Sequence, residues 1–234
     1  MPYFFYYLDP TMLIVLPALI FTVWAQINVN STYNKYSKIM TERGITGYES
    51  ARRILDANGL HDVRIERVHG HLTDHYDPRT NVIRLSDSVF DSRSAAAVGV
   101  AAHEAGHAVQ YATNYGPIKL RGAIIPVTRI GSVAAMPLFI IGLFMAMPEL
   151  MYLGIAFYSL ALVFQLVTLP TEFNASSRAM QALDSSGVLS NSELKASRKV
   201  LTAAALTYVA AMASSLLSLV RLLVIANGAS NRRR

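Results

Sequence analysis

Four long stretches of the sequence carry no charged residue and give the first indication of its fold. They cover residues 10–34, 130–148, 150–171 and 200–220. A helix needs about 20 consecutive apolar residues to cross the hydrocarbon core of a membrane. Only Glu149 separates the second stretch from the third, so these two predict a transmembrane helical hairpin. A hairpin buried inside a soluble protein is the alternative.

The first stretch predicts an uncleaved membrane anchor. An aromatic lead at residues 3–7 precedes it and Trp24 lies near its other end, which suits the two interfaces of a bilayer. A cleaved signal peptide is the competing interpretation, but the lead carries no basic residue and no A-x-A cleavage site follows.

The fourth stretch is rich in Ala and Ser, which allow helices to pack closely in a membrane. It predicts either a full span or a helix packed against the other three. Arg221 follows directly and either pairs with an acid or snorkels to the membrane interface. We expect snorkelling.

A helix, a small sheet and a second helix are predicted between the first stretch and the hairpin. Thr46, followed three residues later by Glu49, is a capping box that predicts the start of a helix ending at Asn58. Residues 63–68 alternate apolar and charged side chains with the period of a strand. Further strands are predicted at residues 71–76 and 82–85, and a helix over about 93–111. The strand at 82–85 is either an edge that pairs with a substrate backbone or purely structural.

Composition narrows the function further. Charged residues are 15% of the chain, against about 25% in soluble domains, which argues against an ordinary soluble enzyme. The net charge is +6, yet residues 35–121 hold 12 basic and 10 acidic residues, so we expect no nucleic-acid partner. With no cysteine, a metal would have to be held by His, Asp or Glu.

Basic residues beside the predicted spans indicate their orientation. Clusters of Lys and Arg follow the first stretch, precede the second and follow the third. All three clusters face the cytoplasm if the N-terminus is outside, which makes the segment 35–121 cytoplasmic. The arginines at 232–234 conflict with this scheme if the fourth stretch is a full span.

The sequence His103-Glu104-Ala105-Gly106-His107 is an H-E-x-x-H motif inside the second predicted helix. Two histidines four positions apart lie on one face of a helix and can bind one zinc ion. Glu104 can then take a proton from a zinc-bound water. The preceding residues are nearly all Ala, Val or Gly, so the helix should be buried, where unpaired His and Glu side chains are costly.

A hydrolytic zinc site usually has a third protein ligand. The acids that follow the motif are Glu149, Glu172, Asp184 and Glu193, and the other histidines all precede it. Glu172 directly follows the third uncharged stretch, so the hairpin returns it to the level of His103 and His107. This argument selects Glu172 over Asp184 and Glu193.

These motifs resemble those of a known family. The segments Ala-Ala-His-Glu-Ala-Gly-His-Ala at 101–108 and Pro-Thr-Glu-Phe-Asn-Ala-Ser-Ser-Arg-Ala at 170–179 are similar to the YugP-type membrane zinc metalloproteases, also called neutral zinc metallopeptidases. Segments 72–80 and 206–211 match as well. The resemblance extends over nearly the whole chain.

The family in turn resembles the HtpX proteases and the CAAX prenyl proteases, in which H-E-x-x-H is followed by a hydrophobic hairpin and E-F-x-A-D. That likeness implies Glu172 as the third ligand. The final Asp of that pattern is Ser176 here, which can donate or accept a hydrogen bond but supplies no charge. Asn174 is a second candidate for that supporting role.

Stabilising an oxyanion requires a further polar group besides the metal. His75, Tyr76 and Arg178 are candidates, although a structural role is the simpler interpretation of each.

Together these inferences predict a mainly α polytopic membrane protein with a small α+β, zincin-like (gluzincin-type) cytoplasmic catalytic domain. We expect a Zn2+-dependent endopeptidase of the bacterial plasma membrane, acting on peptides or membrane proteins at the cytoplasmic boundary. A non-catalytic zinc-binding scaffold is the alternative. A transporter is disfavoured because the uncharged stretches also hold no histidine. The oligomeric state stays open.

The expected parts are a first span at 1–28, a zincin-like part at 29–122, the hairpin at 123–171, a third-ligand helix at 172–200, a fourth span or membrane-packed helix at 201–226 and a basic tail at 227–234.

Overall fold

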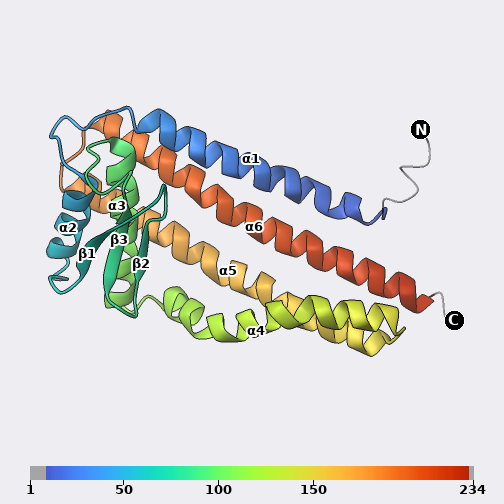
Figure 1. Cartoon of the computed structure of the whole chain (residues 1–234). Helices are drawn as coiled ribbons and strands as arrows, with labels where there is room; N and C mark the ends of the chain where they lie inside the picture. Colours follow the sequence, from blue (N-terminus) through green and yellow to red (C-terminus); the bar gives the residue numbers. More distant parts are fainter. Residues whose placement is uncertain (1–8, 232–234) are drawn as a thin grey trace, which may run out of the picture. The chain divides into compact units, whose positions relative to one another are not determined.

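The chain is mainly helical with one small sheet, as seen in a computed structural model that describes residues 9–231 (Figure 1). Its elements are α1 (Met12–Tyr36), α2 (Gly47–Ala57), β1 (Arg64–Val68), β2 (His75–Asp77), β3 (Val82–Ser86), α3 (Ala95–Ala112), α4 (Gly116–Phe144), α5 (Pro148–Ser185) and α6 (Asn191–Asn231). They form two compact units. The apolar unit comprises Met1–Ala25, Leu120–Thr168 and Thr207–Arg234, and the polar unit comprises Gln26–Lys119 and Leu169–Leu206.

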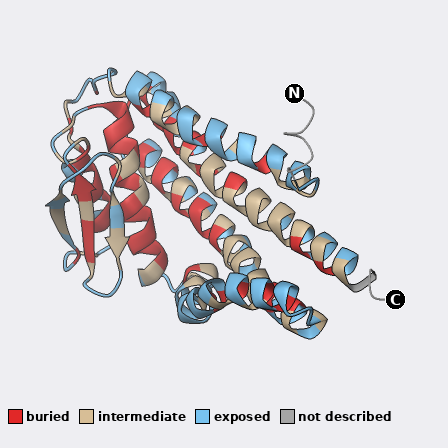
Figure 2. Cartoon of the chain, turned by 45° about the vertical axis from the view of Figure 1, so that its right-hand side comes forward, coloured by how far each residue is buried: buried red, intermediate tan, exposed pale blue. Residues whose placement is uncertain are grey.

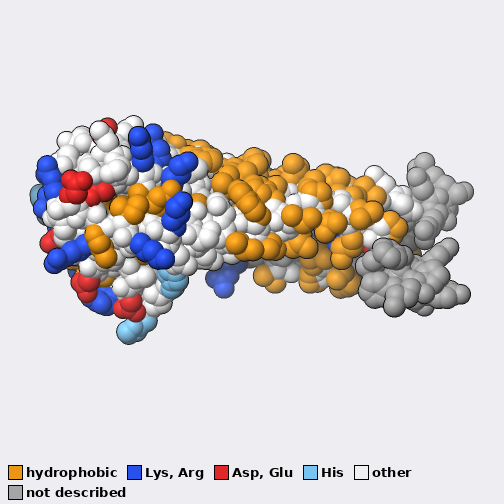
Figure 3. All heavy atoms as spheres, turned by 90° about the horizontal axis from the view of Figure 1, so that it is seen from above, with side chains coloured by type: hydrophobic (Ala, Val, Ile, Leu, Met, Phe, Trp, Pro, Cys, Tyr) orange, Lys and Arg blue, Asp and Glu red, His pale blue; other side chains and the backbone are white. Residues whose placement is uncertain are grey.

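Four of the described helices, α1, α4, α5 and α6, are long and apolar enough to cross a membrane. The mean hydropathy of their most apolar windows is 1.9 to 2.1, yet only 11 to 22% of the residues in those windows are buried. Val133 and Phe144 are 72% and 85% exposed, and Figure 3 shows apolar side chains gathered on the one face of the apolar unit that it presents. Such extensive apolar surface suits a lipid environment rather than water. The aromatic lead at 3–7 lies outside the described residues.

Polar side chains connect the helices at one end of the apolar unit. The Arg221 guanidinium donates to the Asp9 carboxylate at 3.0 Å and to the Thr11 hydroxyl at 3.0 Å. The Tyr152 hydroxyl donates to the Asn227 side chain at 2.7 Å. The start of α1, the start of α5 and the end of α6 therefore lie together. The expectation that Arg221 snorkels was wrong, because folding brings to it an acid that is remote in the sequence.

The predicted helical hairpin is present as α4 and α5, which approach each other closely. A Cβ atom added to Gly154 would lie 2.7 Å from both the carbonyl oxygen of Ala135 and the amide nitrogen of Phe139. Glycine at this position therefore lets the two backbones touch, as small residues do in membrane helix pairs. Phe139 and Met151 are buried in a small core together with Leu222 of α6.

In the polar unit, the local sequence determines where the first helix begins. The Thr46 hydroxyl accepts the amide N–H of Glu49, and the Glu49 carboxylate accepts the amide N–H of Thr46. This capping box satisfies two amide groups that the helix itself leaves unpaired, and the prediction of it was confirmed. The helix ends at Ala57, with Asn58 as its C-cap.

The three strands form one sheet in the order β1-β3-β2. β3 pairs in parallel with β1 and antiparallel with β2. The interpretation of residues 82–85 as an edge strand was wrong, because both edges of β3 are occupied and four of its five residues are buried. The strand predicted over 71–76 is also shorter than expected. It begins only at His75, since Leu72 has a φ of +56°, which is incompatible with an extended strand.

The core of the polar unit is built around α3. Figure 2 shows this helix mostly buried, unlike the long apolar helices. The Ser94 hydroxyl caps its start by accepting the amide N–H of Ala97 at 3.2 Å. Small side chains let neighbouring helices lie close: a Cβ on Gly99 would meet Ser197 of α6 at 3.0 Å. The Ser197 hydroxyl in turn donates to the Ala95 carbonyl at 2.7 Å.

Candidate metal centre

One face of α3 presents two imidazoles side by side. The rings of His103 and His107 are separated by one helical turn, and their centroids are 4.7 Å apart at an interplanar angle of 82°. Glycine between them brings α5 close, because a Cβ on Gly106 would lie 2.7 Å from the carbonyl oxygen of Ala175. The absence of a side chain at Gly106 therefore lets a segment of α5 lie against the two histidines.

That segment of α5 supplies a buried carboxylate. Oε2 of Glu172 lies 3.3 Å from Nε2 of His103 and 3.5 Å from Nε2 of His107. Ligand atoms from these three residues all lie within 4.8 Å of one another, and this is the group of potential metal ligands found among the described residues. Glu172 is 2% exposed and His107 is 8% exposed, so these groups are largely removed from water.

These distances fit a zinc ion. With zinc–ligand bonds of about 2.0–2.2 Å, adjacent ligand atoms of a tetrahedron are about 3.4 Å apart. The two nitrogen-to-oxygen distances in the structure are 3.3 and 3.5 Å. Two imidazoles and one carboxylate are also the donor set of zinc hydrolases that leave a fourth position open. The residues present therefore suit zinc in their chemistry and in the two spacings to Glu172, and the three ligand atoms all lie within 4.8 Å of one another.

Gln110 determines which nitrogen of His107 can act as a ligand. The amide nitrogen of Gln110 donates to the Thr171 carbonyl at 2.8 Å and to the Asn174 side chain at 2.9 Å. With both of its N–H groups used, the amide presents its oxygen to Nδ1 of His107 at 2.9 Å. Nδ1 then donates its proton to Gln110, which leaves Nε2, on the side of Glu172, as the atom that would bind a metal. Gln110 is fully buried.

The second histidine is held by a hydroxyl from α5. Oγ of Ser176 lies 3.1 Å from Nδ1 of His103. The Asn174 side-chain oxygen instead accepts from Gln110, and also from Nε of Arg178 at 2.8 Å. The Arg178 guanidinium lies over the ring of Tyr115, 5.9 Å from its centroid. Three residues predicted to support the site are therefore near it, one directly and two through Gln110.

Sequence reasoning missed Gln110, although a signal was present. It follows His107 by three positions, so both side chains lie on the same face of α3. A polar residue in an otherwise Ala- and Val-rich buried helix needs a partner. The missing information was the carbonyl and amide on α5 that orient it.

Glu104 lies next to the three donors without being one of them. It is 8% exposed. Burial opposes protonation of His107, but a hydrogen bond with Glu172 and the negative charge of Glu104 raise the pKa of His107 above its ordinary value. Burial raises the pKa of Asp74, and the charge of Glu104 adds to that effect. The carboxylate of Glu104 thus acts on both the ligand helix and the segment before β2.

His75 and Tyr76 lie on β2, and their polar atoms have partners in the segments that flank this strand. Nδ1 of His75 lies 2.9 Å from the Thr73 carbonyl, and the Tyr76 hydroxyl donates to Asn81 at 2.8 Å. The Tyr76 ring packs on that of Tyr111 in α3, with 5.6 Å between centroids. Burial raises the pKa of Tyr76 to about 12. These contacts favour a structural role for both residues.

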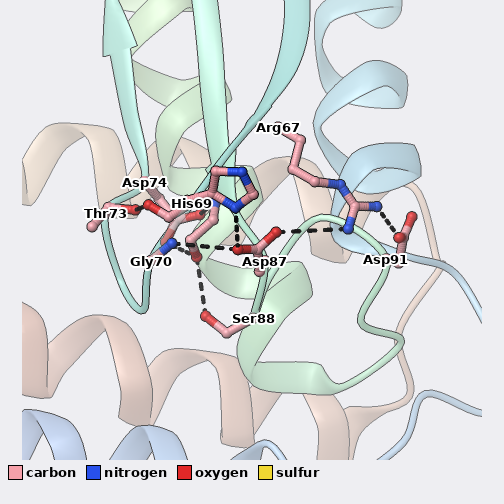
Figure 4. A network of polar contacts seen from close by, with 9 residues as sticks. Arg67, His69, Gly70, Thr73, Asp74, Asp87, Ser88 and Asp91 are labelled. Atoms are coloured by element: carbon pink, nitrogen blue, oxygen red, sulfur yellow. Dashed lines mark hydrogen bonds and ion pairs between the residues drawn. The ribbon is translucent and has the colours of Figure 1, made fainter.

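The remaining histidines lie at exposed positions outside the donor group. His69 is in a surface network shown in Figure 4, where it lies 3.2 Å from the Asp87 carboxylate and Arg67 contacts both Asp87 and Asp91. The His69 side chain is 99% exposed. His61 pairs with Asp56, and His71 lies 3.3 Å from the Ser88 hydroxyl. We therefore assign these histidines to surface contacts.

The two acids considered as alternatives to Glu172 occupy other environments. Asp184 is exposed. Glu193 is 3% exposed, and its carboxylate accepts the amide N–H of Glu42 at 2.6 Å and that of Ser190 at 2.8 Å. Glu193 thus fixes the start of α6, and its replacement will disturb the fold rather than act as a neutral change.

A groove lies beside the candidate centre within the polar unit. It has a volume of about 430 Å³ and lies between α5 and α6. Ser176, which contacts His103, forms part of its wall, and most of the remaining surface is apolar, from residues such as Phe173, Met180 and Leu201. A groove of this size can hold one or two apolar side chains.

The chain is similar to known proteins over most of its length. The sequence model of the family described as "Putative neutral zinc metallopeptidase" matches residues 11–227. A protein of Bacillus subtilis (strain 168), named "Putative membrane protease YugP", is 50% identical over 212 residues, which cover 91% of this chain and 94% of that protein. No solved structure matches the chain.

Proposed function

This chain belongs to the neutral zinc metallopeptidase family, and from that premise we propose that it is a zinc-dependent endopeptidase of the membrane. His103, His107 and Glu172 would hold the metal, and Glu104 would act as the general base. One observation carries the proposal: three donors from α3 and α5, of which His107 and Glu172 are buried and His103 is half-buried, converge with nitrogen-to-oxygen distances of 3.3 and 3.5 Å. Those distances match the edges of a tetrahedral zinc site.

When bound, zinc would supply a Lewis acid that polarises the scissile carbonyl and lowers the pKa of a water molecule. Glu104 accepts the proton of the attacking water and then passes it to the departing amine. Gln110 and Ser176 keep the Nε2 atoms of the two histidines directed at the metal.

Glu104 distinguishes an enzyme from a zinc-binding scaffold, which is the alternative. A scaffold requires only the three donors, and Glu104 is not one of them. Burying the Glu104 carboxylate, which is 8% exposed, costs free energy. A catalytic role beside the metal would explain why the protein keeps a carboxylate there.

The surroundings support a peptide or membrane-protein substrate. The groove lined by Ser176 and Phe173 offers an apolar surface beside His103, and a substrate side chain could occupy it during hydrolysis. We further propose a zincin-like, gluzincin-type domain on the cytoplasmic side of a bacterial plasma membrane. This placement rests on the positions of the basic residues beside the apolar helices.

Replacing Glu104 by Gln tests this function. The variant should bind as much zinc as the wild type but hydrolyse peptides about 100- to 10,000-fold more slowly, because the amide cannot accept a proton. Zinc is measured by atomic emission and hydrolysis with fluorogenic peptides, both in detergent. Glu42→Gln, which changes an exposed acid of the same unit, is the matched control. Full activity of Glu104→Gln would contradict the mechanism, and a zinc-loaded wild type without activity on any peptide would favour the scaffold.

A further inference from the structure

A second polar site lies in the apolar unit, between α4 and α5. Its cavity has a volume of about 290 Å³. Four polar residues, Thr128, Arg129, Ser132 and Gln165, line it together with Ile125, Ala161 and Phe164. The two helices are in close contact nearby, since a Cβ on Gly131 would meet the Leu160 side chain at 2.6 Å. Arg129 is exposed and Gln165 is half-buried, so this cavity opens to the surface of the two helices. Polar groups are unusual along apolar helices and often mark functional sites there.

The chemistry of this cavity suits an anion. The Thr128 hydroxyl already donates to the Ile125 carbonyl at 3.0 Å, and the Ser132 hydroxyl donates to the Thr128 carbonyl at 2.7 Å. The remaining N–H donors belong to Arg129 and Gln165. Within the described part of the chain, neither side chain has a hydrogen-bond partner, and no acid lines the cavity. The cavity therefore has a net positive charge and donors that are free to bind.

Arg221 provides the contrast within the same unit. Its guanidinium contacts the Asp9 carboxylate at 3.0 Å. An arginine within apolar helices is costly unless it reaches an anion or the membrane surface. Arg221 has its anion inside the protein, whereas Arg129 must find one outside.

The position of Arg129 along α4 indicates which anion is available. From Arg129 to the end of α4 at Phe144 the helix rises about 22 Å, compared with a hydrocarbon core of about 30 Å. If the α4–α5 turn lies at one interface, Arg129 lies several ångströms short of the other. A long side chain can extend over that distance toward the headgroups. The anions concentrated at that depth are the phosphodiesters of lipids.

We propose that the cavity between α4 and α5 binds the phosphate of an anionic phospholipid. The Arg129 guanidinium and the Gln165 amide donate to the phosphate oxygens, while Ile125 and Phe164 contact the adjoining acyl chains. Arginine can offer two parallel N–H groups to a phosphate, which makes this contact specific as well as favourable.

Binding of short-chain phosphatidylglycerol to the purified full-length protein tests this proposal. Phosphatidylglycerol should bind at least about tenfold more tightly than short-chain phosphatidylcholine, because both offer a phosphate but the positively charged choline is repelled by the positively charged cavity. Arg129→Gln should remove that preference, Arg129→Lys should retain part of it, and Gln165→Leu should weaken it less. Arg221→Gln is the matched control and should leave lipid binding unchanged.

Zinc content and helical circular dichroism identify variants that fail to fold, and Arg129→Lys keeps the test valid if Arg129→Gln is one of them. Equal binding of the two lipids would overturn the proposal. So would a loss of preference in Arg221→Gln but not in Arg129→Gln. Inorganic phosphate that competes at the same concentration as phosphatidylglycerol would also overturn it, because the ligand would then be free phosphate.

Discussion

The two units of this protein differ in whether their apolar side chains are buried or exposed. In the polar unit, small residues such as Ala101 and Ala105 are completely buried, and they lie among buried polar groups such as Gln110 and Glu172. In the apolar unit, large residues such as Ile130 and Val133 are 69% and 72% exposed. Buried small residues bring helices close enough to assemble a site from side chains, whereas exposed large residues indicate that lipid is the solvent. The polar unit therefore holds the closely packed candidate centre, and the apolar unit has the surface that suits a membrane.

Removing the carboxylate of the candidate centre should give the largest loss of zinc affinity. It tests whether the close packing of the polar unit positions ligands for a metal. Glu172→Ala should weaken zinc binding by more than about 100-fold, since even the partners behind ligands contribute 10- to 100-fold. Chelator competition measures this affinity. Asp184→Ala, which removes an exposed acid from the same helix, is the control. Unchanged zinc affinity in Glu172→Ala would show that the metal is held elsewhere.

A smaller effect is expected from the residue behind His107. Gln110→Leu should lower zinc affinity about 10- to 100-fold, because Nδ1 of His107 loses its acceptor and the ring is no longer held in one tautomer. Gln181→Leu changes an exposed glutamine on α5 and should have no effect on zinc. If both variants bind zinc like the wild type, the hydrogen bonds of Gln110 serve only packing.

Two glycines allow the units to be compared with the same substitution. Gly106→Ala and Gly154→Ala each place a Cβ atom 2.7 Å from a backbone oxygen of a neighbouring helix. Each should lower the free energy of unfolding by about 1–3 kcal/mol through overpacking. Only Gly106→Ala should also lower zinc affinity. Of the two glycines, Gly106 lies between the helix that carries the histidines and α5, whereas Gly154 lies between α4 and α5. Thermal unfolding in detergent and chelator titration measure the two effects.

Gly228→Ala is the control for this pair, since nothing lies within 4 Å of the added atom. It should leave the unfolding temperature unchanged or raise it slightly. A loss of zinc affinity in Gly154→Ala would show that the hairpin and the metal centre are not energetically separate.

The smallest effect concerns the β2–β3 turn of the polar unit. A hydrogen bond from the Thr80 hydroxyl, then one from the Arg79 amide, lower the pKa of Asp77 from 3.8 to about 2. Because its folded pKa is depressed, Asp77 stabilises the fold fully above about pH 4, and this contribution is lost as the pH falls toward about 2. Asp77→Asn should flatten that part of the stability–pH curve. An identical curve for the variant would mean that the turn does not contribute.

The sequence predicted those features that depend on local pattern or on a fixed length. The capping box of α2 and the pairing of His103 with His107 on one helical face follow from residue spacing alone. Glu172 was predicted because the hairpin returns the chain over a known distance, and the structure brings it to the two histidines. Whether the three hold zinc stays a prediction.

Features that depend on distant partners could not be predicted. The period of a strand does not reveal its place in a sheet, so the pattern at residues 82–85 fits an edge strand as well as the central position that β3 occupies. Asp9 and Arg221 are 212 positions apart, and no local pattern pairs them. Gln110 was missed for the same reason, since its orientation is determined by Thr171 and Asn174 on another helix.

The division of the candidate centre between α3 and α5 has a consequence for the timing of its assembly. Both histidines leave the ribosome before the hairpin, and Glu172 follows only after it. At translation rates of about 5–20 residues per second, the 65 or so intervening residues take roughly 3 to 13 seconds. During that interval the nascent chain has H-E-x-x-H but no third donor. A chain that has not yet folded its hairpin therefore lacks a complete candidate centre, and formation of the hairpin is the step that would complete it.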